Sequence, residues 1–302
     1  MYDVIIIGAG PGGMTAALYA GRANLRVGLV EKAIPGGQMN NTADIENYPG
    51  VGLISGAELS ENMYAQLEAY ENIEHIFATV QSIEKDDHFT VKTDDGELTS
   101  KTVIIASGAQ HRHLNVEGES EFEAKGVSYC AICDGAFFKD KDIIVVGGGD
   151  SALEEADFLT QYTSRVTIVH RRDEFRAQKV LQDRVFANKK IDIYWNSIVT
   201  GIYGDNTVTG VQLQDTQFFD CRYIKTDGVF IYVGLDPISD FVPASVKDEF
   251  GYIKTNENME TSIPGLYAIG DVRANQLRQI ATAVGDGAKA GQNAYNYIVE
   301  NK

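Results

Sequence analysis

The chain has 302 residues, enough for about two domains, and its 44% hydrophobic content with 30 glycines and 6 prolines suits an ordinary α/β protein. Its formal net charge of −17 argues against a nucleic-acid groove and against binding to an anionic membrane surface. No apolar run approaches the roughly 18 residues of a membrane span, and the apolar start lacks the basic region of a signal sequence, so we expect a cytoplasmic protein.

The first predicted elements surround a glycine-rich turn. They are a strand over 2–7, the turn Gly8-Ala9-Gly10-Pro11-Gly12-Gly13, a helix over 14–22 and a strand over 25–30. Gly8 allows the tight turn, Gly10 lets the backbone approach a pyrophosphate, and Gly13 lets the helix pack closely on the strand. Glu31 falls 23 residues after Gly8, where a carboxylate can accept hydrogen bonds from adenosine ribose hydroxyls. This combination predicts a dinucleotide-binding fold.

The sequence Cys130-Ala131-Ile132-Cys133-Asp134 holds two thiols at a spacing that can close a small disulfide. The acid that follows Cys133 adds a proton donor or acceptor at the place where thiolates would form and disappear. A zinc site needs four ligands, whereas Cys221 is the remaining cysteine and the sequence has no second CxxC or HxxxH-type spacing. We therefore favour a redox pair over metal ligands and regard Cys221 as an inert thiol.

A second glycine-rich turn repeats the first pattern. A strand over 142–146, the turn Gly147-Gly148-Gly149-Asp150-Ser151-Ala152, a helix over 153–161 and a strand over 165–169 are predicted. His170 falls 23 residues after Gly147, in the place of Glu31, and is followed by Arg171 and Arg172, with Arg176 about a turn further on. Arginines here reject a bare ribose diol and favour a 2′-phosphate, which indicates NADPH rather than NADH. A solvated basic turn is the alternative, but it is less suited to so acidic a chain.

Two dinucleotide folds in one chain indicate two different dinucleotides. One is expected to be NADPH, and the fold with the acid is most naturally an FAD site, because a flavin can link a hydride donor to a dithiol. Strands over 103–106 and 230–233, each followed by a glycine-containing turn, close the two halves in a similar way. This internal likeness supports duplicated domains.

The end of the chain is too short for a third domain and is predicted to return to the first. A strand over 266–271 ends in Gly-Asp, and a long amphipathic helix is predicted over 277–299. The return would bring Asp271 near the middle of the first ligand. We therefore predict an α/β fold with two Rossmann-like three-layer domains, the NADPH domain being inserted in the FAD domain. The expected bounds are 1–111 and 241–302 for the FAD domain and 112–240 for the NADPH domain.

Several motifs in this order closely resemble the low-molecular-weight thioredoxin reductase family over essentially all 302 residues. They are GAGPGG, CAICDG, GGGDSALEEA, HRRDEFRA and the late Gly-Asp. The resemblance implies that NADPH reduces thioredoxin by way of FAD and the cysteine pair, in a homodimer whose domains rotate between half-reactions. It also implies that Cys133 is the flavin-proximal sulfur, Cys130 the thiol that attacks thioredoxin, and Asp134 the acid that handles the proton.

The same resemblance implies the cofactor ligands. For FAD they are Gly8, Gly10, Gly13, Glu31, Gly37, Gln38, Asn47, Gly108, Asp271, Arg278, Gln279 and Ile280. For NADPH they are Gly147, Gly149, Asp150, Ser151, His170, Arg171, Arg172 and Arg176.

Four alternative functions remain open from the sequence. A flavin subunit that reduces a peroxiredoxin would carry an extra N-terminal thioredoxin-like region, and a dithiol oxidase would lack an intact coenzyme site. A reductase of ferredoxin or flavodoxin would lack the cysteine pair. From another class, the chain could be a redox sensor that holds both cofactors without turnover, although the two thiols and Asp134 argue against this.

Overall fold

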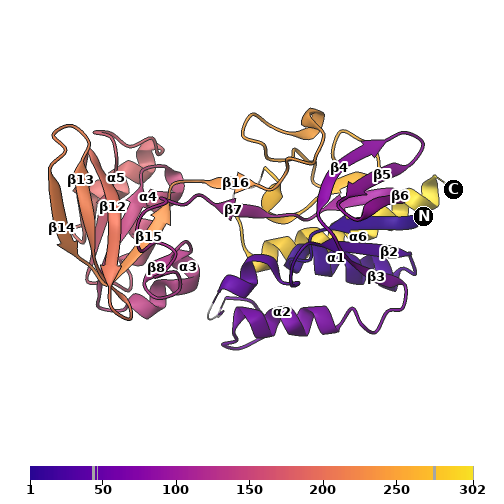
Figure 1. The fold of residues 1–302 in the computed structure, drawn as a ribbon, viewed down its shortest axis with the longest axis horizontal. Helices are drawn as coiled ribbons and strands as arrows, with labels where there is room; N and C mark the ends of the chain where they lie inside the picture. The colour runs from indigo at the N-terminus through magenta and orange to yellow at the C-terminus, as the bar shows by residue number, and fades with distance from the viewer. Residues whose placement is uncertain (43–44, 46, 275–276, 302) are drawn as a thin grey trace. The chain divides into compact units, whose positions relative to one another are not determined.

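The computed structural model describes residues 1–42, 45, 47–274 and 277–301. The chain divides into two compact units. Unit 1 comprises Met1–Gln110 together with Asp236–Lys302, and unit 2 comprises His111–Leu235. At the two crossings, strands β7 (Ala109–His111) and β16 (Leu235–Pro237) pair with each other (Figure 1). Unit 2 is therefore inserted within the sequence of unit 1.

Unit 1 is built on a mainly parallel sheet with the order β3-β2-β1-β6-β5-β4, in which β17 also pairs with β6. The β1, β2, β3, β6 and β17 pairings are parallel, and β4, β5 and β6 pair antiparallel. The elements are β1 (Tyr2–Ile7), α1 (Pro11–Arg22), β2 (Val27–Glu31), η1 (Gly37–Asn41), α2 (Gly56–Ala65), β3 (Ile73–Phe77), β4 (Val80–Lys85), β5 (Phe89–Thr93), β6 (Gly96–Ile105), η3 (Ala244–Val246), β17 (Leu266–Ala268), η4 (Gly270–Val272) and α6 (Ile280–Glu300).

The central strand β1 is apolar on both faces because both faces of the sheet are covered. Val4 and Ile6 pack into a core shared with α1, α2 and α6, whereas Ile5 and Ile7 pack into a second core with β5 and the segment 242–253. A row of buried strand residues between two covering layers gives the unit its three-layer form.

Helices α1 and α6 pack closely because glycines lie at their contact (Figure 1). A Cβ on Gly287 would lie 2.3 Å from the carbonyl oxygen of Gly12, and one on Gly291 would lie 2.8 Å from that of Ala16. The predicted return of the chain to its first unit is therefore a backbone-to-backbone contact between the first and last helices.

Unit 2 has a parallel sheet with the order β11-β10-β9-β15-β8 and a separate antiparallel sheet with the order β12-β13-β14. Its elements are β8 (Val127–Ser128), α3 (Ala131–Asp134), η2 (Gly135–Phe138), β9 (Asp142–Gly147), α4 (Asp150–Leu159), β10 (Arg165–Val169), α5 (Lys179–Ala187), β11 (Ile191–Tyr194), β12 (Ser197–Gly204), β13 (Val208–Asp215), β14 (Cys221–Lys225) and β15 (Gly228–Tyr232). Helices α4 and α5 share one core with the parallel sheet, and the antiparallel sheet shares a second core with its other face. The predicted α/β class with parallel sheets is confirmed.

The two predicted helices after the glycine turns both begin three residues earlier than their apolar pattern indicates. Helix α1 begins at Pro11 and α4 begins at Asp150, each directly after a glycine in extended conformation. A proline at the first helical position costs no hydrogen bond, because that N–H has no partner within the helix. Among the described helices, none is long and apolar enough to cross a membrane.

Candidate active site and cofactor sites

The glycine turn of unit 1 combines two packed glycines with an open one. Gly8 has φ +104°, and a Cβ there would lie 2.4 Å from the carbonyl oxygen of Ala106. A Cβ on Gly13 would lie 1.8 Å from the carbonyl oxygen of Gly8. A Cβ on Gly10, by contrast, would meet no described atom within 4 Å. The protein itself requires Gly8 and Gly13, whereas Gly10 leaves open space of the kind that a pyrophosphate occupies beside a helix N-terminus.

Glu31 ends β2 beside this turn and is held by backbone amides. One carboxylate oxygen accepts from Ala9 N at 2.8 Å, and the other accepts from Lys32 N at 2.8 Å and Ala33 N at 3.1 Å. An ionised carboxylate has about four acceptor sites, so these three bonds leave capacity for a ribose hydroxyl. The carboxylate is fixed in position before any ligand arrives.

A second group of expected FAD ligands lies around the same turn. A Cβ on Gly37 would lie 3.3 Å from the Cα atom of Gly10. Gln38 donates from Nε2 to the carbonyl oxygen of Ala109 at 3.1 Å, next to Gly108. Gly108 has φ +71° and, like Gly10, has no described atom within 4 Å of an added Cβ. Segments following β1, β2 and β6 thus meet at the carboxyl edge of the sheet.

Helix α6 brings the C-terminal residues to this edge. Gln279 is the N-cap of the helix, its backbone N–H donates to Thr282 Oγ1 at 3.1 Å, and Ile280 is the first helical residue. The side-chain oxygen of Gln279 accepts a hydrogen bond from Asn47 Nδ2 at 3.0 Å. Asn47 and Gln279 are 232 positions apart in the sequence, so the fold unites two expected flavin contacts that the sequence separates.

Asp271 and Arg278 are partly buried polar residues of unit 1. Burial raises the pKa of Asp271, the nearby carboxylate of Asp286 raises it further, and Arg278 opposes this. The Arg278 guanidinium lies 4.9 Å from the centre of the Tyr252 ring, and its buried Nε has no hydrogen-bond partner among the described residues. A buried donor without an acceptor is costly, so a ligand that supplies an oxygen fits this place. The open glycines and this donor together fit FAD.

Cys130 and Cys133 form a disulfide at the short helix α3 of unit 2. Cys130 is the N-cap, and the backbone N–H of Cys133 donates to the sulfur of Cys130 at 3.2 Å. The intervening Ile132 is exposed. The sulfur pair is therefore closed, partly exposed and polarised by an amide, and this confirms that the two cysteines pair as a disulfide.

Two residues that the sequence patterns did not single out support the disulfide. The Ser128 hydroxyl donates to an Asp134 carboxylate oxygen at 2.6 Å and accepts from the backbone N–H of Cys130 at 3.1 Å. The Tyr232 hydroxyl accepts from Ala131 N at 2.6 Å, and burial raises the pKa of Tyr232 well above its usual range. Ser128 lies two positions before Cys130, but Tyr232 comes from the distant strand β15 and leaves no signal near the cysteines.

The glycine turn of unit 2 repeats the geometry of the first. Gly147 has φ +157°, and a Cβ on Gly149 would meet no described atom within 4 Å. Ser151 is exposed at the start of α4. The Asp150 carboxylate accepts from the backbone N–H of Gln178 at 2.7 Å and from its Nε2 at 3.0 Å. Asp150 therefore holds the segment after the arginines onto the glycine turn.

The arginines and His170 differ in burial beside this turn. Arg171, Arg172 and Arg176 are exposed, and the backbone N–H of Arg176 donates to the carbonyl oxygen of Gly148 at 2.9 Å. His170, expected among the coenzyme ligands, is instead buried beneath the turn, where a Cβ on Gly148 would lie 2.2 Å from its Nδ1. The guanidinium groups are free to meet an anion, whereas the imidazole supports the loop from below.

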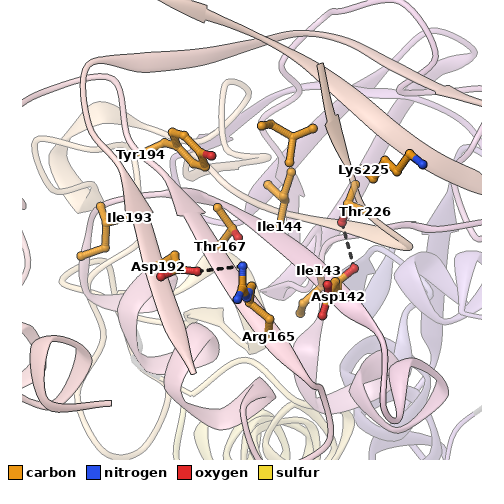
Figure 2. A pocket seen from close by; sticks show the side chains of 11 residues that line it. Asp142, Ile143, Ile144, Arg165, Thr167, Asp192, Ile193, Tyr194, Lys225 and Thr226 are labelled. Atoms are coloured by element: carbon orange, nitrogen blue, oxygen red, sulfur yellow. Dashed lines mark hydrogen bonds and ion pairs between the residues drawn. The ribbon is translucent and has the colours of Figure 1, made fainter. Parts of the chain in front are cut away.

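A pocket of about 340 Å³ lies at the opposite edge of the same parallel sheet (Figure 2). It is bounded by the amino ends of β9 and β10, by β11 and by the end of β14, and it contains an ion pair between Arg165 and Asp192 at 3.4 Å. Thr226 donates to the Asp142 carbonyl oxygen at 3.0 Å at its margin. Gly147 ends β9 and Arg171 follows the carboxyl end of β10, so this pocket is separate from the expected coenzyme site.

Comparison with known proteins connects this geometry to a family. The family model for pyridine nucleotide-disulphide oxidoreductases matches residues 2–287. The thioredoxin reductase of Listeria monocytogenes is 51% identical over 305 residues, covering 100% of this chain and 95% of that protein.

Solved structures of thioredoxin reductases match as well. That from Streptococcus pyogenes is 54% identical, covers 99% of both chains and superposes with a TM-score of 0.94. That from Lactococcus lactis, described as being in the FR conformation, is 49% identical, covers 99% of this chain and 100% of the other, and superposes with a TM-score of 0.70. The chain therefore belongs to the low-molecular-weight thioredoxin reductases of the pyridine nucleotide-disulphide oxidoreductase family.

Proposed function

We propose that the chain reduces the disulfide of thioredoxin with NADPH, holding FAD in unit 1 and NADPH in unit 2. The observation that carries the proposal is the Cys130–Cys133 disulfide in the same unit as the arginine-flanked glycine turn. FAD, when bound, would supply the two-electron chemistry that links the nicotinamide to this disulfide. The remaining steps are performed by side chains and amides of the chain itself.

Unit 1 binds and orients its cofactor through fixed polar groups. The open space at Gly10 receives phosphates at the N-terminus of α1, where backbone amides and the helix dipole favour anions. Glu31 accepts from ribose hydroxyls with the acceptor capacity that its three backbone bonds leave. Arg278 would donate its buried Nε–H, which has no partner among the described residues, to a cofactor oxygen.

Unit 2 selects a phosphorylated coenzyme by charge. Gly149 leaves space for the pyrophosphate, and Arg171, Arg172 and Arg176 offer exposed guanidinium groups where a 2′-phosphate would lie. NADH has only a hydroxyl at this position, so it would leave these cations without an anion.

The protein-disulfide step belongs to the cysteines. Once the pair is reduced, the Cys133 amide that faces the Cys130 sulfur favours a thiolate at Cys130. That thiolate attacks one sulfur of thioredoxin, breaking its disulfide and forming a mixed disulfide, while the released thioredoxin thiolate takes up a proton. Cys133 then attacks the Cys130 sulfur, which releases reduced thioredoxin and re-forms the Cys130–Cys133 disulfide. Asp134, held by Ser128, is placed to move these protons.

The division of roles between the units requires movement, because the disulfide and the coenzyme turn share unit 2 while the flavin ligands lie in unit 1. We propose that unit 2 rotates relative to unit 1 between half-reactions, about the paired crossings β7 and β16. Two thioredoxin reductases of similar identity superpose with TM-scores of 0.94 and 0.70, which supports more than one arrangement within the family. We further propose a homodimer, as the family resemblance implies.

The test compares three cysteine variants with NADPH and thioredoxin as substrates. Cys130→Ser and Cys133→Ser should each lose thioredoxin reduction by at least about 10³-fold, whereas Cys221→Ser, which removes the exposed free thiol, should retain it. Cys133→Ser should also accumulate a mixed disulfide between Cys130 and thioredoxin that is visible on non-reducing gels. Full activity in either active-pair variant would exclude the proposal.

A further inference from the structure

Among the residues that the structure describes, Glu119 is the only buried acid, and the proposed reaction does not use it. It is 3% exposed, although the other acids of the same segment of unit 2, Glu117, Glu121 and Glu123, face solvent. A buried carboxylate is costly unless hydrogen bonds compensate for the lost water. The bonds that Glu119 makes therefore indicate what its burial achieves.

Four hydrogen-bonding groups surround the Glu119 carboxylate. Oε1 accepts from the backbone N–H of Leu114 and from the Tyr129 hydroxyl, both at 2.9 Å, and His113 Nδ1 lies 3.3 Å from the same oxygen. Oε2 accepts from the backbone N–H of Asn115 at 2.7 Å. A carboxylate offers about four acceptor sites, so these partners satisfy it without water.

Tyr129 connects this carboxylate to the redox disulfide. It directly precedes Cys130, and its hydroxyl lies 2.9 Å from His113 Nδ1 as well as from Glu119. Its ring stacks on that of His111, the last residue of β7, with 5.0 Å between the ring centres. The Tyr129 side chain is therefore held both on its face and at its hydroxyl, and the backbone of Cys130 follows directly from it.

The other side of the disulfide is held separately. Helix α3 carries Cys133, and its first amide, the N–H of Ala131, donates to the Tyr232 hydroxyl of β15 at 2.6 Å. The Glu119 carboxylate acts before Cys130 in the chain and this bond acts after it, so the backbone is fixed on both sides. When the backbone at two thiols is fixed, each faces the other at a high effective concentration, which favours the disulfide over the dithiol.

We propose that Glu119 is a positioning residue, which acts through Tyr129 to hold Cys130 where it closes readily onto Cys133. Loss of this anchor would let Cys130 sample positions away from its partner thiol. The disulfide would then be less stable relative to the dithiol, and its reduction potential less negative. In the proposed function, on which this last step rests, closure of the disulfide also releases thioredoxin, so the mixed disulfide would last longer.

The experiment equilibrates the flavin-loaded protein with mixtures of oxidised and reduced dithiothreitol, which supplies the two electrons and two protons that reduction requires. Alkylation and peptide mass give the fraction of Cys130 and Cys133 present as thiols. Tyr129→Phe, which removes only the hydroxyl, and Glu119→Gln should each make the disulfide about three- to tenfold easier to reduce, a shift of about 14 to 30 mV toward less negative potential. Glu121→Gln, which changes an exposed acid of the same segment, should leave the potential unchanged.

The double variant Glu119→Gln/Tyr129→Phe tests whether Glu119 acts through Tyr129. Both changes break the same bond, so the double variant should show the larger of the two single shifts rather than their sum. Additive shifts would overturn the inference.

A purely structural role for Glu119 is tested by the same set of proteins. Tyr129 is only half-buried, so Tyr129→Phe reports on the anchor even where Glu119→Gln does not fold. A lower unfolding temperature with an unchanged or more negative potential in Tyr129→Phe would overturn the inference. Failure of NADPH to reduce the wild-type disulfide would instead overturn the proposed function, while the equilibrium with dithiothreitol would still decide whether the anchor exists.

Discussion

The two glycine turns have similar backbone arrangements and differ in the side chains that lie beside them at the end of the second strand. In each unit a buried parallel strand leads into a glycine with positive φ, and two residues later a second glycine, Gly10 or Gly149, faces open space. At the equivalent later position, Glu31 accepts one backbone hydrogen bond from the turn, from Ala9 N, and two from the residues that follow it, Lys32 and Ala33. His170 is instead buried, and the arginines that follow it are exposed. We propose that both turns bind a pyrophosphate and that the choice of nucleotide depends on the side chains at and after the end of the second strand.

The helices after the two turns differ in their neighbours. Gly13 of α1 is replaced by Ala152 in α4, and the fully buried Ala16, against which α6 packs, is replaced by Glu155. Burial, with the adjacent Glu154 as a smaller cause, raises the pKa of Glu155 to about 7. In unit 1, Ala16 lies where α6 packs on α1, and Gly13 lies against the Gly8 carbonyl oxygen. In unit 2, α4 has room for a methyl group and a carboxyl group at the two equivalent positions.

The largest effect is expected when Gly13, the third glycine of the first motif, is replaced by the alanine found at the equivalent position of unit 2. Gly13→Ala would place a Cβ 1.8 Å from the Gly8 carbonyl oxygen, so the turn must move, at a cost of about 3 kcal/mol or more in the free energy of unfolding, with loss of bound flavin. The reciprocal change, Ala152→Gly, should cost only about 1 kcal/mol. Calorimetric unfolding and the flavin absorbance of the purified proteins measure both effects. Normal flavin content in Gly13→Ala would mean that the two turns are not equivalent in the way described.

The second prediction concerns the arginines that stand in place of the acid. Arg172→Ala should lower kcat/KM for NADPH by about 10- to 100-fold, because a charge-assisted hydrogen bond to the 2′-phosphate is lost, and should leave kcat/KM for NADH within about twofold. Arg165→Ala removes an exposed arginine at the opposite edge of the same sheet and serves as the control. A parallel loss with both coenzymes would assign Arg172 to general folding rather than to coenzyme choice.

The third prediction concerns Glu155, the carboxyl group of α4 at the position that Ala16 occupies in α1. Because the folded-state pKa of Glu155 is about 7 and its usual value is 4.5, the unfolded chain ionises first, so wild-type stability falls as the pH rises from about 4.5 to above 7. Glu155→Gln has no such loss and should be more stable than wild type by about 1–2 kcal/mol at pH 8, after allowance for the partial exposure of the side chain. The advantage should vanish toward pH 4 in calorimetric unfolding. Glu154→Gln, which removes only the neighbouring charge, should give a smaller gain, and a pH-independent difference would contradict the assignment.

Sequence reasoning succeeded where the backbone alone imposes the requirement. Glycine spacing predicted both turns, because a positive φ or a close backbone contact admits few residue types. The strand predicted over 165–169 has the expected bounds. The strand predicted over 103–106 belongs to the longer β6, which begins at Gly96, because its first half is paired and only partly buried and so carries a weaker apolar pattern.

Contacts between distant segments were beyond reach. His170 is buried beneath the turn, where it packs against Phe175 and Trp195. The motif HRRDEFR alone does not predict this packing. Tyr232 reaches Ala131 from 101 positions away, and the bond depends on how β15 lies beside β8. Spacing predicts which backbone groups face a ligand, but the packing of neighbouring elements decides which side chains do.

The smallest effect is expected on FAD affinity when the Glu31 carboxylate of unit 1 is replaced by an amide. In Glu31→Gln one side-chain position becomes an N–H donor, so either the bond from Ala9 N or the bonds from Lys32 N and Ala33 N are lost, and a ribose hydroxyl loses its charged acceptor. We expect FAD to bind about 5- to 10-fold more weakly to the apoprotein, equivalent to about 1 kcal/mol, as measured by flavin fluorescence during reconstitution. Glu71→Gln, an exposed residue of the same unit, should leave the affinity unchanged. If NADPH affinity fell as well, the acid would not be confined to the flavin side, and the contrast between the two turns would lose its functional meaning.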